Sequence, residues 1–200
     1  MLQYVLTESE KWSVGELAQM AIEGGCMWIT LHLPRLTDAE IRELIEPDII
    51  EMCREASVFL TIDDRPELTR ELGLHGVRLS LSYFITHPES TPLSLREELG
   101  PEAVIGVECV DASFLPEFVP ADLDFITLPS TVSQTERERF LTDAKRGRFS
   151  FPVVAEGART IDDALAAMAD GCSGVAIGWP ITDSRDPVSA TRDFLDALHQ

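Results

Sequence analysis

Charged side chains stand at or near the ends of several short apolar runs, where a catalytic or binding site would use them. Asp64, Glu108 and Glu156 each follow such a run, and Arg78 lies near the end of another. Two carboxylates in one pocket raise the pKa of one of them, which can create an acid/base pair. Arginine binds carboxylates and phosphates through two parallel hydrogen bonds. These four residues form our candidate catalytic set, and Asp64 is also a candidate ligand for a metal ion or a cationic substrate.

Each of these side chains also has a purely structural interpretation. Asp63 or Asp64 can cap a helix that begins at Arg65 and Pro66, because aspartate before proline is a common helix start. Arg78 can form a salt bridge with Glu108 or Asp64 that only neutralises buried charge. The sequence leaves both interpretations open, since a register slip of one residue reverses which side chains point inward.

Short apolar segments alternate with amphipathic stretches along the whole chain. Such segments are typical of strands buried on both faces of a parallel sheet. The predicted strands are 3–6, 27–33, 58–62, 76–79, 104–107, 125–128, 151–155 and 174–177.

The amphipathic stretches carry helix start and stop signals. Capping-box patterns begin at Ser13, Thr37 and Thr160, and Asp186 precedes proline at the start of the last helix. The segment 113–119 predicts only a weak helix, because Pro116 interrupts it. The segment 81–92 is the longest predicted loop and the best candidate for a lid or a partner surface. Glycines that are expected to end helices are Gly24, Gly25, Gly73, Gly100 and Gly171.

The strand starts recur about every 25 residues, so that the alternation fills the 200 residues with eight strand–helix units. This arithmetic predicts a closed (β/α)8 barrel, an α/β fold near its minimum length, built as one domain over residues 1–200. A doubly wound sheet is the alternative, but the sequence has no glycine-rich first turn of the G-x-G-x-x-G type. In a barrel, the candidate residues would meet at the carboxyl ends of the strands.

The composition excludes several kinds of partner. The chain has 35 acidic and 16 basic residues, a net charge of −19, and no basic patch that would offset it against nucleic acid or an anionic membrane. No apolar run is long enough to span a bilayer, and the amino-terminal segment does not resemble a secretion signal. Buried, reduced thiols are expected at Cys26, Cys53, Cys109 and Cys172. We therefore expect a cytoplasmic protein that binds a small molecule.

Six segments, in order along the chain, carry a family resemblance. The runs at 60–68 and 74–79, which contain Asp63-Asp64-Arg65 and Gly76-Val77-Arg78, resemble the third and fourth strands of the thiamin phosphate synthase family, which includes thiazole tautomerases. The other matches are at 104–107, 121–126, 151–155 and 170–177. The resemblance covers essentially the whole chain and implies a barrel that binds a phosphorylated or heterocyclic small molecule in thiamin biosynthesis.

The resemblance also implies where a diphosphate and magnesium would bind. The family holds a pyrimidine diphosphate with a Gln-x-Arg-x-Lys motif, and the matching positions here are Thr30, His32 and Pro34. Proline carries no charge, and an unperturbed His32 would be mostly neutral at pH 7. Of the family's two magnesium-binding aspartates, one matches Asp64 and the other aligns near Tyr83. Magnesium is expected as a cofactor if synthase activity is retained.

For the product phosphate, the family uses backbone N–H groups in the turns after its seventh and eighth strands. The matching phosphate-binding residues here are Gly157, Ala158, Arg159, Gly178 and Trp179. Arg159 would add charge and Trp179 could stack on a heterocycle, whereas Pro180 has no N–H. The substrate pocket would be completed by Thr30, His32 and Ser130, which stands where the family has a Thr-x-Thr-Lys run.

Three functions remain open at this stage. The first is a synthase that joins a pyrimidine diphosphate to a thiazole phosphate and releases pyrophosphate. The second is a binding or regulatory barrel without catalysis, which the missing cations near the second strand favour. The third is an enzyme of different chemistry that uses Glu108, Glu156 and Arg78 on a non-phosphorylated or cationic ligand. Pairing of two copies through outer helices is also left open.

Overall fold

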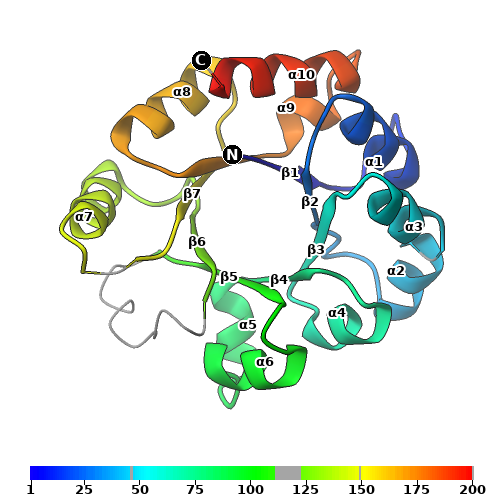
Figure 1. Cartoon of the computed structure of the whole chain (residues 1–200), viewed down its shortest axis with the longest axis horizontal. Coiled ribbons are helices and arrows are strands. Elements are labelled where there is room, and N and C mark those ends of the chain that lie inside the picture. The colour runs from blue at the N-terminus through cyan, green and yellow to red at the C-terminus, as the bar shows by residue number, and fades with distance from the viewer. Residues whose placement is uncertain (46, 111–122, 149, 200) are drawn as a thin grey trace.

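A computed structural model describes residues 1–45, 47–110, 123–148 and 150–199. Eight parallel strands close into a barrel in sequential order, with helices around the outside (Figure 1). The predicted (β/α)8 fold is therefore confirmed. The strands are β1 (Leu2–Leu6), β2 (Trp28–Leu31), β3 (Phe59–Asp63), β4 (Gly76–Leu79), β5 (Val104–Glu108), β6 (Phe125–Leu128), β7 (Val153–Glu156) and β8 (Gly174–Ile177).

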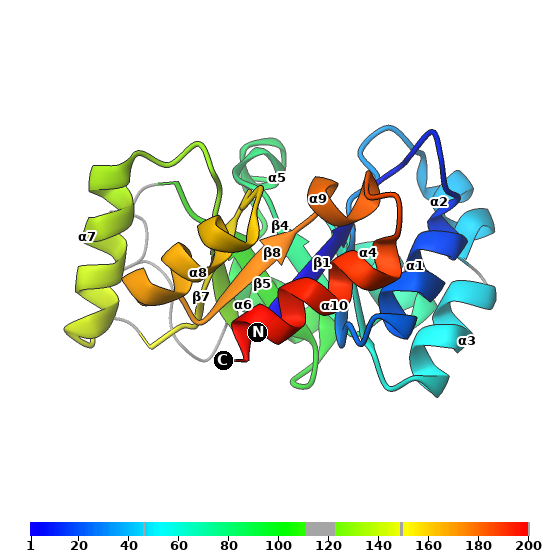
Figure 2. The same cartoon turned by 90° about the horizontal axis from the view of Figure 1, so that it is seen from above.

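Helices cover the outer face of the barrel. The bounds are α1 (Val14–Glu23), α2 (Asp38–Ile45), α3 (Asp48–Glu55), α4 (Pro66–Leu72), α5 (Leu81–Thr86), α6 (Pro92–Leu99), α7 (Gln134–Lys145), α8 (Ile161–Asp170), α9 (Trp179–Thr182) and α10 (Pro187–Leu198). Figure 2 shows α5 and α9 at one end of the barrel, with the two chain termini toward the other end. No described helix is long and apolar enough to cross a membrane.

Helix starts follow the predicted capping signals. Ser13 and Thr160 both form complete capping boxes, and Thr37 exchanges hydrogen bonds with Glu40 in the same pattern. The side chain of Asp186 accepts a hydrogen bond from the Ser189 N–H at the start of α10. The predicted weak helix at 113–119 lies outside the described residues.

Three predictions about local structure differ from the observed elements. The segment 81–92 is not one long loop: α5 occupies its first half, and α6 begins at Pro92. Ser80 caps α5 by accepting a hydrogen bond from the Tyr83 N–H, and Thr91 caps α6. The predicted strand 151–155 begins only at Val153, because Pro152 has no N–H for the ladder. The strand predicted at 27–33 is likewise shorter, ending at Leu31 before Pro34.

The apolar residues separate into two clusters. The larger one lies between the sheet and the helices, and a smaller one, which includes Val5, Phe125 and Val154, fills the inside of the barrel. Trp28 from β2 meets Phe125 from β6 edge to face, with ring centroids 4.9 Å apart. Because side chains alternate along a strand, this contact identifies which residues of β2 and β6 point inward. The candidate site lies at the carboxyl end of that inward-facing set.

Candidate active site

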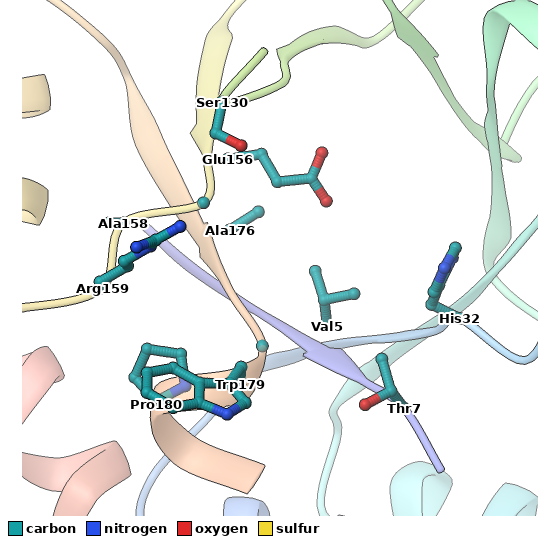
Figure 3. Close-up of a pocket in the computed structure, with 12 residues that line it drawn as sticks. Val5, Thr7, His32, Ser130, Glu156, Ala158, Arg159, Ala176, Trp179 and Pro180 are labelled. Atoms are coloured by element: carbon teal, nitrogen blue, oxygen red, sulfur yellow. The ribbon is translucent and has the colours of Figure 1, made fainter. Parts of the chain in front are cut away.

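A cavity of about 520 Å³ opens at the carboxyl end of the barrel. Its lining includes the turns after β7 and β8 and His32 at the end of β2 (Figure 3). Eight predicted site residues line it, and they comprise His32, Ser130, Glu156, Gly157, Ala158, Arg159, Gly178 and Trp179. The structure thus brings the five predicted phosphate-binding residues together around one cavity.

The turn after β7 depends on a glycine. Gly157 has a φ of +84°, in the left-handed region, and a Cβ at this position would lie 2.5 Å from the Cβ of Ser130. The N–H groups of Arg159 and Thr160 both donate to the Asp163 carboxylate at the start of α8. The anion donors that this turn offers are consequently the N–H groups of Gly157 and Ala158 and the guanidinium of Arg159.

A smaller cavity of about 150 Å³ contains all four candidate catalytic residues. Asp64, Arg78, Glu108 and Glu156 line it together with Ser80, Asp63 and His32. These side chains come from the ends of five different strands and the turns that follow them. The structure therefore places the two cavities beside each other, since His32 and Glu156 line both.

Arg78 is buried and paired with two carboxylates. Its Nε donates to Asp63 at 2.8 Å, and its Nη1 donates to Glu156 at 2.9 Å. The predicted salt bridge is thus present, but the predicted partners, Glu108 and Asp64, are wrong. The register between β3 and β4 aligns Asp63 with Arg78, so Asp63 is the carboxylate that points inward beside it.

Charge pairing determines the protonation of this group. Burial alone would raise the pKa of Asp63, but the Arg78 charge and hydrogen bonds from His32 and Arg78 bring it below its ordinary value. Burial would lower the pKa of Arg78, and the two carboxylates instead raise it. Asp63 is therefore ionised and Arg78 is cationic at neutral pH.

Asp63 also binds His32, at 2.7 Å between Oδ2 and Nδ1. This hydrogen bond raises the pKa of His32 above its ordinary value, against the opposing effect of burial. The environment of His32 thus favours its protonated form more than that of a free imidazole would. Asp63 is the site residue that the sequence reasoning missed as an inward-facing group. Asp63 lies two residues after Thr61, so the two side chains point to the same side of β3. The side chain of Thr61 points into the barrel, where it hydrogen-bonds to Thr30.

Glu108 and Glu156 share the smaller cavity, as the predicted acid pair would. The pKa of Glu108 is raised, first by burial and then by the negative charge of Glu156. Glu156 is paired with Arg78, whereas the structure shows no such salt bridge for Glu108 among the described residues.

Asp64 does not cap α4. The N-cap of α4 is Arg65, which forms no side-chain capping bond, whereas Asp64 accepts hydrogen bonds at 2.7 Å from both the N–H and the Oγ of Ser80. Asp64 therefore joins the turn after β3 to the turn after β4. Its backbone has a φ of +54°, which is uncommon for a residue other than glycine.

The described residues do not fit a protein-held magnesium ion. Asp64 already uses both carboxylate oxygens on Ser80. The second aspartate of the family pattern aligns near Tyr83 of α5, whose ring stacks on that of His87. No group of three or more His, Cys, Asp or Glu side chains that could hold a metal ion occurs in the described ranges. The interpretation of Asp64 as a metal ligand thus gains no support from the geometry.

Thr30 is not part of the cavity. Its side chain is buried inside the barrel, one layer below His32, where it hydrogen-bonds to Gln3 and Thr61 at 2.7 Å each. The prediction of Thr30 as a pocket residue is therefore wrong. A threonine at this depth satisfies polar neighbours in the barrel interior and does not line either of the two cavities.

A closed parallel barrel with cavities at the carboxyl ends of its strands defines a (β/α)8 protein whose candidate site lies at the end of the barrel where such folds carry theirs. Residues 3–181 match the family model described as thiamine monophosphate synthase. The chain belongs to that family.

Individual relatives cover nearly the full length. The chain is 26% identical over 208 residues to a thiamine-phosphate synthase from Bacteroides thetaiotaomicron, covering 98% of this chain and 96% of the relative. It is 28% identical over 196 residues to a thiamine-phosphate synthase from Natronomonas pharaonis, covering 93% and 88%. Among solved structures, a thiamine phosphate pyrophosphorylase from Pyrococcus furiosus has a TM-score of 0.79 at 21% identity, covering 98% of this chain and 95% of that one. At that identity, the structural likeness shows the fold alone.

Proposed function

We propose that this protein is a thiamine-phosphate synthase that joins a pyrimidine diphosphate to a thiazole phosphate. The observation that carries this proposal is the cavity of about 520 Å³ that is lined by the turns after β7 and β8. The chain also matches the synthase family over residues 3–181. Such turns at the carboxyl end of a barrel are a common phosphate-binding device. The thiazole phosphate ester would bind at Gly157, Ala158 and Arg159.

The reaction breaks one bond and forms another. The bond between the pyrimidine methylene carbon and the diphosphate oxygen breaks, and its electron pair leaves with the diphosphate. The lone pair of the thiazole nitrogen forms the new carbon–nitrogen bond, so the product ring is a cationic thiazolium. The carboxylate of Glu156, which borders both cavities, would stabilise positive charge that develops on the joined rings.

Magnesium would enter this site with the diphosphate of the substrate, because few protein ligands are needed when phosphate oxygens complete the coordination. This assignment agrees with the poor metal-binding geometry around Asp64. The protein's own contribution would be to orient the two substrates and exclude water.

The alternative enzyme that uses Arg78 on a ligand is less well supported. Arg78 donates to Asp63 and Glu156 and is only 7% exposed, so its guanidinium is occupied within the protein. We further propose that residues 1–200 work as one domain in the cytoplasm, where charged phosphorylated substrates are made and retained. Its partners would be these small molecules.

Calorimetric titration with thiazole phosphate and with the corresponding thiazole alcohol tests the ligand assignment. We expect the phosphate ester to bind about 10–100-fold more tightly, because hydrogen bonds to a charged group each add about 1.5–3 kcal/mol. Equal affinities for the two compounds, or no binding of either, would contradict a phosphate site at these turns. Inorganic sulfate at the same ionic strength controls for general salt effects.

A further inference from the structure

His32 is held in one orientation by a chain of buried charges. Its Nδ1 lies 2.7 Å from Oδ2 of Asp63, and Asp63 is fixed in turn by two hydrogen bonds from Arg78. Arg78 is itself fixed by Glu156 at 2.9 Å. A carboxylate that binds one imidazole nitrogen sets both the ring orientation and the position of the proton on the other nitrogen.

The free edge of this imidazole faces the candidate active site. Because Nδ1 is bound to Asp63, Nε2 is the nitrogen available to a ligand. The His32 side chain is 44% exposed, whereas that of Asp63 is 11% exposed, so solvent and ligands reach the histidine but hardly reach its partner. Figure 3 shows His32 on the side of the cavity opposite Arg159 and the turn after β7. A ligand whose phosphate lies at that turn would extend toward His32.

The proposed synthase reaction has an anionic leaving group that a cation or a proton would stabilise. A leaving diphosphate gains negative charge as its bond to carbon breaks. Among the described residues that line the two cavities, the basic side chains are Arg159, Arg78 and His32. Arg159 lies at the phosphate turn, and Arg78 is occupied by Asp63 and Glu156. His32 is therefore the basic group placed to act on a second anionic group.

We propose that His32, oriented by Asp63, is a catalytic acid that donates its Nε2 proton to the departing diphosphate. The electron pair of the breaking carbon–oxygen bond goes to the diphosphate oxygen, which accepts this proton, and the imidazole becomes neutral. Water returns a proton to Nε2 after pyrophosphate leaves. This step rests on the proposed synthase reaction, and it gives the chain a proton donor where a permanent cation is missing.

The surrounding charges favour the protonated form that this role needs. The negative charges of Asp63 and Glu156 stabilise the imidazolium, while burial and the Arg78 charge oppose it, and the pKa of His32 is raised overall. Asp64 and Glu108 line the same small cavity, and Arg159 lines the larger one. Because the acid form is required, activity should be highest below the pKa of His32 and should fall as the pH rises through it.

The variant His32→Gln tests this role, with His87→Gln as its control because His87 lines neither cavity. We expect His32→Gln to lower kcat by about 100-fold or more and to abolish the fall in kcat with rising pH. The control should keep the wild-type kcat and pH profile. A His32→Gln enzyme with the wild-type kcat and pH profile would overturn the proposal.

A second measurement separates this proposal from the synthase assignment. In an NMR titration of the imidazole signals, inorganic pyrophosphate should raise the pKa of His32 and leave that of His87 unchanged. This result would hold even in a protein with no turnover, in which case only the proposed function would fail. A His32 pKa that does not respond to saturating pyrophosphate would overturn the acid role directly.

Discussion

Replacing Arg78 with methionine is expected to lower the free energy of unfolding by about 3–5 kcal/mol at pH 7. The substitution keeps most of the side-chain volume but leaves the carboxylates of Asp63 and Glu156 without their cation. Asp63 is buried, and a buried carboxylate without a partner costs far more than the pair contributes. Urea denaturation of the wild type and the variant measures the difference.

The pH dependence of this loss has a defined sign. In the wild type, the pKa of Asp63 is lowered, so its contribution to stability is present above the unfolded pKa and is lost as the pH falls through the folded pKa. In Arg78→Met, the lowering effect of Arg78 is lost while burial still raises that pKa, so ionised Asp63 should contribute less to stability than in the wild type. The gap between the two proteins should therefore widen from pH 4 to pH 7.

Arg35→Met is the matched control. Arg35 pairs with Glu8 at 3.0 Å but is 76% exposed, so its loss should cost no more than about 1 kcal/mol. Two results would contradict this account. One is a loss of less than about 1 kcal/mol in the free energy of unfolding of Arg78→Met. The other is a difference between wild type and Arg78→Met that does not change with pH.

Replacing Gly157 with alanine is expected to lower the affinity for thiazole phosphate by about 100-fold. A Cβ at this position meets the Cβ of Ser130 at 2.5 Å, and the φ of +84° is unfavourable for alanine. The turn must therefore shift, which moves the N–H groups of Gly157 and Ala158 away from the phosphate. Misplacement by about 1 Å is sufficient for an effect of this size. Calorimetric titration with thiazole phosphate measures it.

Gly147→Ala separates backbone strain from loss of the site. Gly147 also has a positive φ, +69°, but no atom of the residues that the structure describes lies within 4 Å of its Cβ position, and it lines neither cavity. Both variants should lose stability from the positive φ, Gly157→Ala more because of the added contact with Ser130, and only Gly157→Ala should lose affinity. Wild-type affinity in a folded Gly157→Ala protein would exclude the turn after β7 as the phosphate site.

Most of the fold was predictable because its signals are local. Each barrel strand is a short apolar run, and capping residues such as Ser13 and Thr160 indicate where the following helices begin. The segment 81–92 was misassigned because α5 has only six residues and a weak sequence pattern. The start of α5 depends on its cap Ser80, whose hydroxyl donates a hydrogen bond to Asp64 in the turn after β3.

The details of the site were less predictable because they depend on register between strands. Whether Asp63 or Asp64 points inward changes with a shift of one residue, and the sequence of β3 is apolar enough to permit either. The pairing of Arg78 with Asp63 and Glu156 joins residues 15 and 78 positions apart. By contrast, the turns at Gly157 and Gly178 were identified without the structure, because the family resemblance implied them.

The most direct test of the proposed function is a turnover measurement with the purified wild-type protein, a pyrimidine diphosphate, a thiazole phosphate and Mg²⁺. Thiamine phosphate is quantified by mass spectrometry and pyrophosphate by a coupled assay. We predict that both products accumulate in a 1:1 ratio, and that omitting either substrate abolishes thiamine phosphate formation. If neither product forms while both substrates are shown to bind, the chain is not a synthase, and the proposed function is wrong.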